Sequence, residues 1–249
     1  MNLEEITMNR RALLKAAAIT GAGALLGGVL AGCGGSGVAV ADTSLDGTIL
    51  GAAKIAEALA TTMYTAIIED AAFFADLSPE DQSYITAARD QEKFHYDLLK
   101  AATGGTDAQL SYFFPTGMFT DLATTINTLV TLEDAFIAAY LIGVKDLSSP
   151  ALRVLAAQIM GVESDHRTLA RLIGDELGLT QITGLSGTPE EVDPPNNNVY
   201  ERTYGLTSID QVVAALTPFL SAGTDTVEKV FRPAYQPSNM GLYPNPANG

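Results

Sequence analysis

Four long segments between residues 45 and 178 carry apolar residues at helical spacing, and no proline interrupts any of them beyond its first turn. In the first segment the apolar positions include Ile49, Ile55, Leu59, Met63 and Ile67. Ser78-Pro79 and Ser149-Pro150 each offer a capping serine followed by proline at the first helical position. The pattern predicts an all-α chain with helices over about 45–74, 79–102, 119–145 and 150–177, the last closed by Gly178.

The connections predict how these helices are arranged. The first and second helices, like the third and fourth, are joined by short turns, which favour antiparallel neighbours. A longer aromatic-rich connection, with Tyr112, Phe113, Phe114 and Pro115, separates the two pairs. We therefore expect an antiparallel four-helix bundle over residues 45–178, with a long crossover between helices two and three.

Both histidines of the chain stand three residues after a glutamate, as Glu92/His95 and Glu163/His166. Residues at i and i+3 share one face of a helix, so each pair can point at one place. Two such pairs, together with one glutamate from each of the other two helices, form the ligand set of a di-metal carboxylate site. The alternative is that the glutamates are solvated and the histidines make ordinary hydrogen bonds.

Depth in the bundle selects the remaining two glutamates. Residues at equal depth in an antiparallel hairpin have their sequence midpoint in the turn. The midpoint of Glu57 and His95 is residue 76, in the first turn, whereas Glu69 and His95 give residue 82, inside the second helix. Glu133 and His166 give 149.5, in the second turn. The predicted metal ligands are therefore Glu57, Glu92, His95, Glu133, Glu163 and His166.

The two halves also repeat a glutamate–tyrosine spacing. Tyr64 follows Glu57 by seven residues, and Tyr140 follows Glu133 by seven. The two Glu/Tyr pairs are 76 residues apart in the sequence, and the two Glu-x-x-His pairs are 71 residues apart. This near-constant offset indicates an internal two-fold pattern. Each tyrosine lies about 10 Å along the axis from its glutamate, on the same side. Such tyrosines hydrogen-bond the ligating groups or shuttle electrons, or they are ordinary core residues with a satisfied hydroxyl. Asp97, Asp134 and Asp165 are candidates to orient a histidine.

The N-terminus has the features of an export signal. Arg10-Arg11 precede an apolar run over 16–32 that is short for a membrane span, and the run ends at Cys33, the only cysteine. The pattern resembles a bacterial twin-arginine lipoprotein signal over 1–32, with a lipid on Cys33 and a tether over 33–44. We therefore expect an exported protein anchored to a membrane of the cell envelope. An uncleaved anchor is the alternative.

A C-terminal extension over 179–249 follows the bundle. It holds Pro194-Pro195-Asn196-Asn197-Asn198, a short helix at about 207–221 with Ser208 as its cap, and a proline-rich tail from Arg232. We expect the extension to pack against the bundle or to mediate contacts, and a homodimer remains open. The net charge of −15 argues against binding of nucleic acid.

With these residues the chain resembles the ferritin-like superfamily, and within it the bacterial ferritin-like domain proteins related to plant desiccation-related proteins. The resemblance covers 45–178 and implies that Glu92 and Glu163 bridge two metals, while Glu57 and Glu133 are terminal ligands. Ala60 stands where some relatives carry another acidic residue.

Carboxylate and imidazole ligands suit two iron or manganese ions, and we favour iron. The resemblance implies an oxidoreductase of the ferroxidase, peroxidase or manganese-catalase kind, acting on O₂, peroxide or Fe(II). Two alternatives stay open. One is a non-enzymatic metal-binding or stress-protection lipoprotein, and the other is a metal-free structural bundle.

Overall fold

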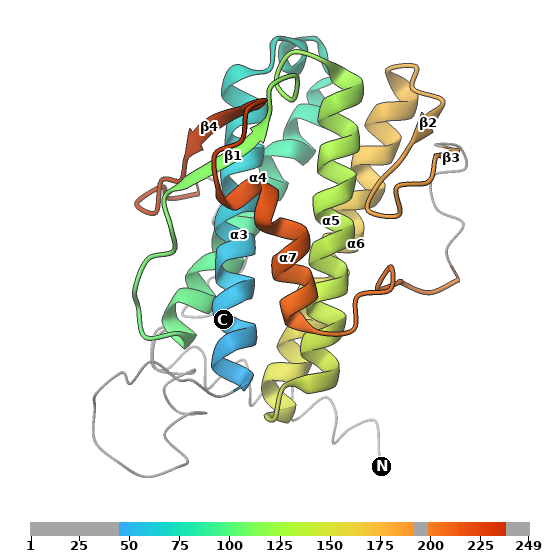
Figure 1. Cartoon of the computed structure of the whole chain (residues 1–249). Coiled ribbons are helices and arrows are strands. Elements are labelled where there is room, and N and C mark those ends of the chain that lie inside the picture. Colours follow the sequence, from blue (N-terminus) through green and yellow to red (C-terminus); the bar gives the residue numbers. More distant parts are fainter. Residues whose placement is uncertain (1–44, 192–198, 238–249) are drawn as a thin grey trace.

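Four long antiparallel helices form the centre of the computed structural model, which describes residues 45–191 and 199–237 (Figure 1). They are α3 (Leu45–Asp70), α4 (Pro79–Ala102), α5 (Leu122–Asp146) and α6 (Pro150–Glu176). The most extensive contacts are those within the hairpins α3–α4 and α5–α6. The predicted all-α bundle with a long crossover between its second and third helices is confirmed.

Two predicted helix boundaries were wrong. Helix α3 ends at Asp70, because Ala71 takes extended backbone and a 3₁₀ helix (η1, Ala72–Asp76) follows. Helix α5 begins at Leu122 because the Asp121 carboxylate accepts the Thr124 N–H at 2.8 Å. Phe119, which the prediction had placed in this helix, is buried before it and contacts the Phe114 ring.

The capping serines behave differently from one another. Ser78 caps α4 as predicted, accepting the Asp81 N–H at 3.1 Å. Ser149 and Ser208 occupy cap positions without a side-chain capping bond. Near the start of α6, the Ser148 hydroxyl donates to Asp46 Oδ2 at 2.5 Å, which ties the second turn to the first residues of α3.

The extension packs on the bundle through a strand pair that the sequence analysis did not predict. Strand β1 (Ser111–Pro115), in the crossover, pairs antiparallel with β4 (Thr226–Val230). After β4, Phe231 is buried edge-on against Tyr96, with ring centroids 4.6 Å apart. Helix α7 (Ile209–Leu220) contacts α3 and α5 (Figure 1), and β2 (Gln181–Ile182) pairs with β3 (Glu190–Glu191). The crossover and the extension thus hold each other against the helices.

Several predictions lie outside the described residues. These are the export signal, Cys33 and the tether, the run from Pro194 to Asn198, and the last residues of the tail. Within the described part, α5 is the one helix long and apolar enough to cross a membrane, and most of its apolar stretch is buried in the bundle. The burial of this stretch in the bundle core accounts for the apolar composition of α5.

Candidate metal centre

All six predicted ligands meet in the middle of the bundle. Helices α3 and α5 contribute one glutamate each, and α4 and α6 contribute one Glu-x-x-His pair each. All six side chains belong to residues at most 6% exposed: Glu57, Glu92, His95, Glu133, Glu163 and His166. Glu69, the rejected alternative, lies at the surface, where Arg232 donates to both of its carboxylate oxygens at 2.8 Å.

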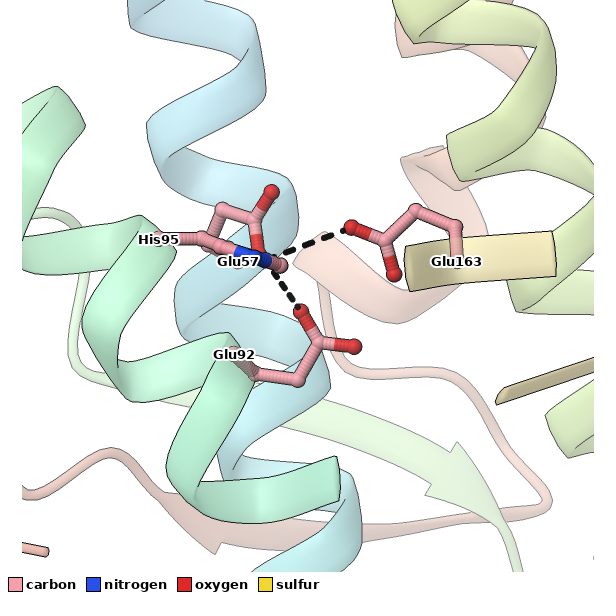
Figure 2. Close-up of side chains that lie close together, drawn as sticks. All are labelled: Glu57, Glu92, His95 and Glu163. Carbon is pink, nitrogen blue, oxygen red and sulfur yellow. Dashed lines mark ion pairs between the residues drawn. The ribbon is translucent and has the colours of Figure 1, made fainter. Parts of the chain in front are cut away.

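The six side chains form two overlapping groups that share Glu92 and Glu163. In the first group, His95 Nδ1 lies 3.4 Å from Glu92 Oε2, from Glu163 Oε1 and from Glu57 Oε2. Figure 2 shows these four side chains converging from three helices. Within each group, the ligand atoms lie within 4.8 Å of one another.

The second group uses the other oxygens of the shared glutamates. His166 Nδ1 lies 2.9 Å from Glu92 Oε1 and 3.3 Å from Glu163 Oε2. It also lies 3.9 Å from Glu133 Oε1. Each shared glutamate therefore presents one oxygen to each histidine, which is the arrangement that the implied bridging role requires.

Unsatisfied atoms test whether the centre fits metal ions. Eight of the eleven buried side-chain atoms without a hydrogen-bond partner in the described residues belong to these six side chains. They are Glu57 Oε2, both oxygens of Glu92, His95 Nδ1, Glu133 Oε2, both oxygens of Glu163 and His166 Nδ1. Buried polar atoms in proteins are nearly always hydrogen-bonded. Eight unsatisfied atoms facing one another, all oxygen or imidazole nitrogen, fit iron or manganese ions.

The charges in the centre are not balanced by protein groups alone. Burial, then the nearby carboxylates of Glu163 and Glu57, raise the pKa of Glu92 well above its usual range. Burial also raises the pKa of Glu133. Burial acts in the same direction on Glu163, but contacts with the two imidazoles outweigh it and lower the Glu163 pKa to about 2. With all four carboxylates ionised, the centre would carry two excess negative charges even when both imidazoles are protonated.

The two tyrosines bond the terminal glutamates crosswise. Tyr64 of α3 donates to Glu133 Oε1 of α5 at 2.5 Å, and Tyr140 of α5 donates to Glu57 Oε1 of α3. Burial and these carboxylates raise the pKa of both hydroxyls well above 10. The predicted spacing of seven residues thus brings each tyrosine to the glutamate of the opposite helix rather than to its own.

Sequence reasoning missed Gln91. Its Oε1 lies 2.7 Å from His166 Nε2, so an imidazole protonated at Nε2 donates to it and leaves Nδ1 for metal. The aspartates considered for this role lie elsewhere. Asp134 contacts Arg167 and the Leu185 N–H, Asp97 pairs with Lys93, and Asp165 is exposed. A glutamine beside a ligand carries no distinctive spacing, so no sequence signal marked it.

Replacing Gln91 by leucine is expected to weaken metal binding about 10-fold or more, because the His166 ring loses the acceptor that fixes its tautomer. Equilibrium dialysis against Mn(II) measures the affinity. Gln158→Leu, at an exposed position of α6, is the matched control and should bind as the wild type does. Equal affinities for the two variants would show that Gln91 does not position His166.

One comparison with known proteins found a match, and it covers the bundle. Residues 45–175, more than half of the chain, match the family model described as a ferritin-like domain. This range contains all six side chains of the centre. No curated protein and no solved structure matches the chain.

Proposed function

The chain belongs to the ferritin-like domain family, and from this premise we propose that it binds two ions of iron or manganese and has redox activity towards O₂, peroxide or Fe(II). The buried glutamates and histidines fit a di-metal carboxylate protein. The observation that carries the proposal is the set of eight unsatisfied atoms in two groups sharing Glu92 and Glu163. Iron is favoured over manganese in the proposal.

Each proposed ion has its own set of ligands. Glu57 and His95 would hold one ion, Glu133 and His166 would hold the other, and the shared glutamates would bind both. Bound iron or manganese supplies one-electron chemistry and open coordination positions.

The protein would supply fixed positions for the ions and a buried surrounding. The glutamates and histidines of the centre are almost wholly buried, so their charges interact strongly. Tyr64 and Tyr140 each donate to one oxygen of a terminal glutamate, which leaves the other oxygen without a partner and able to bind a metal ion. A role of these tyrosines in electron transfer is part of the proposal.

Metal analysis tests the proposal. Protein purified after native export is expected to contain about two metal ions per chain, and His95→Ala/His166→Ala is expected to contain almost none. Fewer than about one ion per chain in the wild type would contradict the metal centre. Two ions without turnover of O₂, peroxide or Fe(II) would instead favour a non-enzymatic metal-binding or stress-protection protein.

We further propose that the chain acts at the cell envelope, held by a lipid on Cys33. Support comes from Arg10-Arg11, the apolar run and the cysteine that ends it. Cys33→Ala is expected to lose incorporation of labelled palmitate and to leave the membrane fraction. A Cys33→Ala protein that stays with the membrane would favour the uncleaved anchor, and export that survives Arg10→Lys/Arg11→Lys would contradict the twin-arginine route.

A further inference from the structure

A buried arginine joins the two helices that carry Glu133 and His166. Arg167 of α6 is 3% exposed, and its Nη1 donates to Asp134 Oδ1 of α5 at 3.3 Å. Asp134 follows Glu133 in the sequence, and Arg167 follows His166. The ion pair therefore links α5 and α6 beside the ligands proposed for one of the two ions, which we call the second ion.

The C-terminal extension completes this link. Glu201 Oε2 lies 2.8 Å from Arg167 Nη1, and Arg167 Nη2 donates to Glu201 Oε1 at 3.0 Å. The same Glu201 oxygen accepts the Ser164 hydroxyl at 2.6 Å. The Glu201 carboxylate therefore holds the two residues that directly follow the α6 ligands. We call Asp134, Ser164, Arg167 and Glu201 the Arg167 bridge.

A second part of the extension reaches the Arg167 bridge through Gly184. This glycine has a φ of +56°, and a Cβ at its position would lie 2.6 Å from Asp134 Oδ2. Only glycine permits so close an approach in this conformation. The next residue, Leu185, donates its N–H to the same oxygen at 3.0 Å. Two separate segments of the extension thus meet at the bridge.

The equivalent place in the other half of the bundle holds no charged pair. The offset of 76 residues that relates Glu133 to Glu57 places Ala58 opposite Asp134, and the offset of 71 residues places Tyr96 opposite Arg167. Tyr96 is fully buried, and Phe231 of the extension packs edge-on against its ring. At this level, apolar contacts therefore hold the α3–α4 hairpin, whereas buried charges hold the α5–α6 hairpin.

The Arg167 bridge restrains the α6 ligands because it is next to them on the helix. Any turn or shift of α6 that moves Glu163 and His166 also moves Ser164 and Arg167. Such a movement would separate buried charges from their partners, which is costly. The bridge therefore opposes displacement of the two α6 ligands.

We propose that the Arg167 bridge fixes the ligands of the second ion, so that the extension is a positioning part of the metal centre. The inference rests on the proposed function and assigns Arg167 and Glu201 as positioning residues, which act through Glu163 and His166. The bridge residues from Glu201 onwards lie beyond residues 45–175, which match the ferritin-like domain.

Mn(II) affinity in variants with one histidine tests the proposal for each ion separately. His95→Ala keeps the second group of ligands, and His166→Ala keeps the first. Adding Glu201→Ala is expected to weaken Mn(II) binding about 10-fold in His95→Ala. In His166→Ala the expected loss is about 2-fold or less, because the first group takes only Glu163 from α6. Equal losses in the two backgrounds, or no loss in either, would overturn the proposal.

The fold should survive Glu201→Ala, because Arg167 keeps its ion pair with Asp134. Glu201→Gln removes the same charge but keeps an oxygen that can accept from Ser164 and Arg167. It should therefore retain most of the affinity in the His95→Ala background. A loss as large as that of Glu201→Ala would assign the effect to charge and overturn the positioning role.

Glu190→Ala is the matched control for the attachment of the extension. Glu190 also ties the extension to α6, since it accepts from Arg171 Nη1 at 3.2 Å, one turn beyond Arg167. This variant should leave the Mn(II) affinity of the His95→Ala protein unchanged. A loss equal to that of Glu201→Ala would show that any weakened attachment has the same effect, which would overturn the role of the bridge.

Imidazole NMR of the metal-free protein tests the same positioning without an ion. The chain has two histidines, so His95→Ala and His166→Ala assign their signals. Gly184→Ala forces a Cβ against Asp134 and is expected to shift or broaden the His166 signals, while those of His95 stay unchanged. Gly187→Ala has a similar backbone cost, with a φ of +67°, but its Cβ meets no heavy atom within 4 Å. It should change neither histidine.

His166 signals that are the same in Gly184→Ala as in the wild type would overturn the proposal. Because this experiment uses metal-free protein, its outcome does not depend on metal binding. Failure of the metal analysis and failure of the positioning test are therefore separate results.

Discussion

Glu92→Gln/Glu133→Gln is expected to stabilise the metal-free protein by about 1–4 kcal/mol and to abolish its metal binding. Burial raises the pKa of both carboxyls, so their ionisation opposes folding at neutral pH. Glutamine keeps the shape of glutamate without its charge. In the double variant, the two remaining carboxylates face two imidazoles, and protonation of both imidazoles balances the charge.

The double substitution is thus expected to raise the stability of the metal-free protein and, at the same time, to remove its metal binding. Urea unfolding in the presence of a chelator gives the free energy of unfolding of the metal-free proteins, and metal analysis gives the loss of binding. Glu80→Gln/Glu228→Gln removes the same two charges at exposed positions and should change neither quantity appreciably. If the metal-free Glu92→Gln/Glu133→Gln protein had a lower free energy of unfolding than the metal-free wild type, these carboxylates would stabilise the fold instead of destabilising it.

Most of the bundle was predictable because its helices carry strong local signals. Apolar periodicity located α4 and α6 almost to the residue, since Pro79 and Pro150 fix their starts. Local signals did not predict the structure where contacts between distant segments determine the backbone conformation. Nothing in the sequence from Ala71 to Phe74 breaks a helix, yet Ala71 is extended and Phe73 packs against the core. Pairing of the β1 and β4 strands joins segments that lie far apart in the sequence, which helical periodicity does not detect.

The candidate centre was predictable for a related reason. The spacing of residues along a helix predicts which face they share, and the midpoint rule predicts which residues of a hairpin lie at the same depth. The depth rule therefore distinguished the buried Glu57 from Glu69, which lies at the surface. The same reasoning predicted two-fold tyrosines able to hydrogen-bond the ligands, but it did not predict which glutamate each tyrosine reaches. The hydrogen bonds of Tyr64 and Tyr140 cross to the opposite helix, because the side-chain direction between α3 and α5 depends on their packing. Gln91 likewise depends on the contact between α4 and α6.

The stabilisation of the protein by Mn(II) is expected to increase between pH 5.5 and pH 7.5, because metal ions displace protons from the centre. Burial lowers the pKa of His95 and His166, but the neighbouring glutamates outweigh it and raise both above 6.5. Their contribution to stability is complete below pH 6.5 and is lost as the pH rises through the raised values. The raised pKa values of Glu92 and Glu133 act in the same direction, from pH 4.5 upwards. Glu163, with a pKa of about 2, opposes them only below pH 4.5.

Thermal unfolding at several pH values, with Mn(II) or with chelator, measures this effect as a widening gap between the two melting temperatures. The free energy of stabilisation should grow by about 1.4 kcal/mol per pH unit for each proton that the metal displaces. Glu92→Gln/Glu133→Gln, which lacks two of the predicted ligands, should show no gap at any pH. Two divalent ions would balance the four carboxylates without protons, so the stability of the metal-bound protein should vary less with pH than that of the metal-free protein. A gap that stays constant from pH 5.5 to pH 7.5 would mean that Mn(II) binds without displacing these protons, and therefore outside the centre.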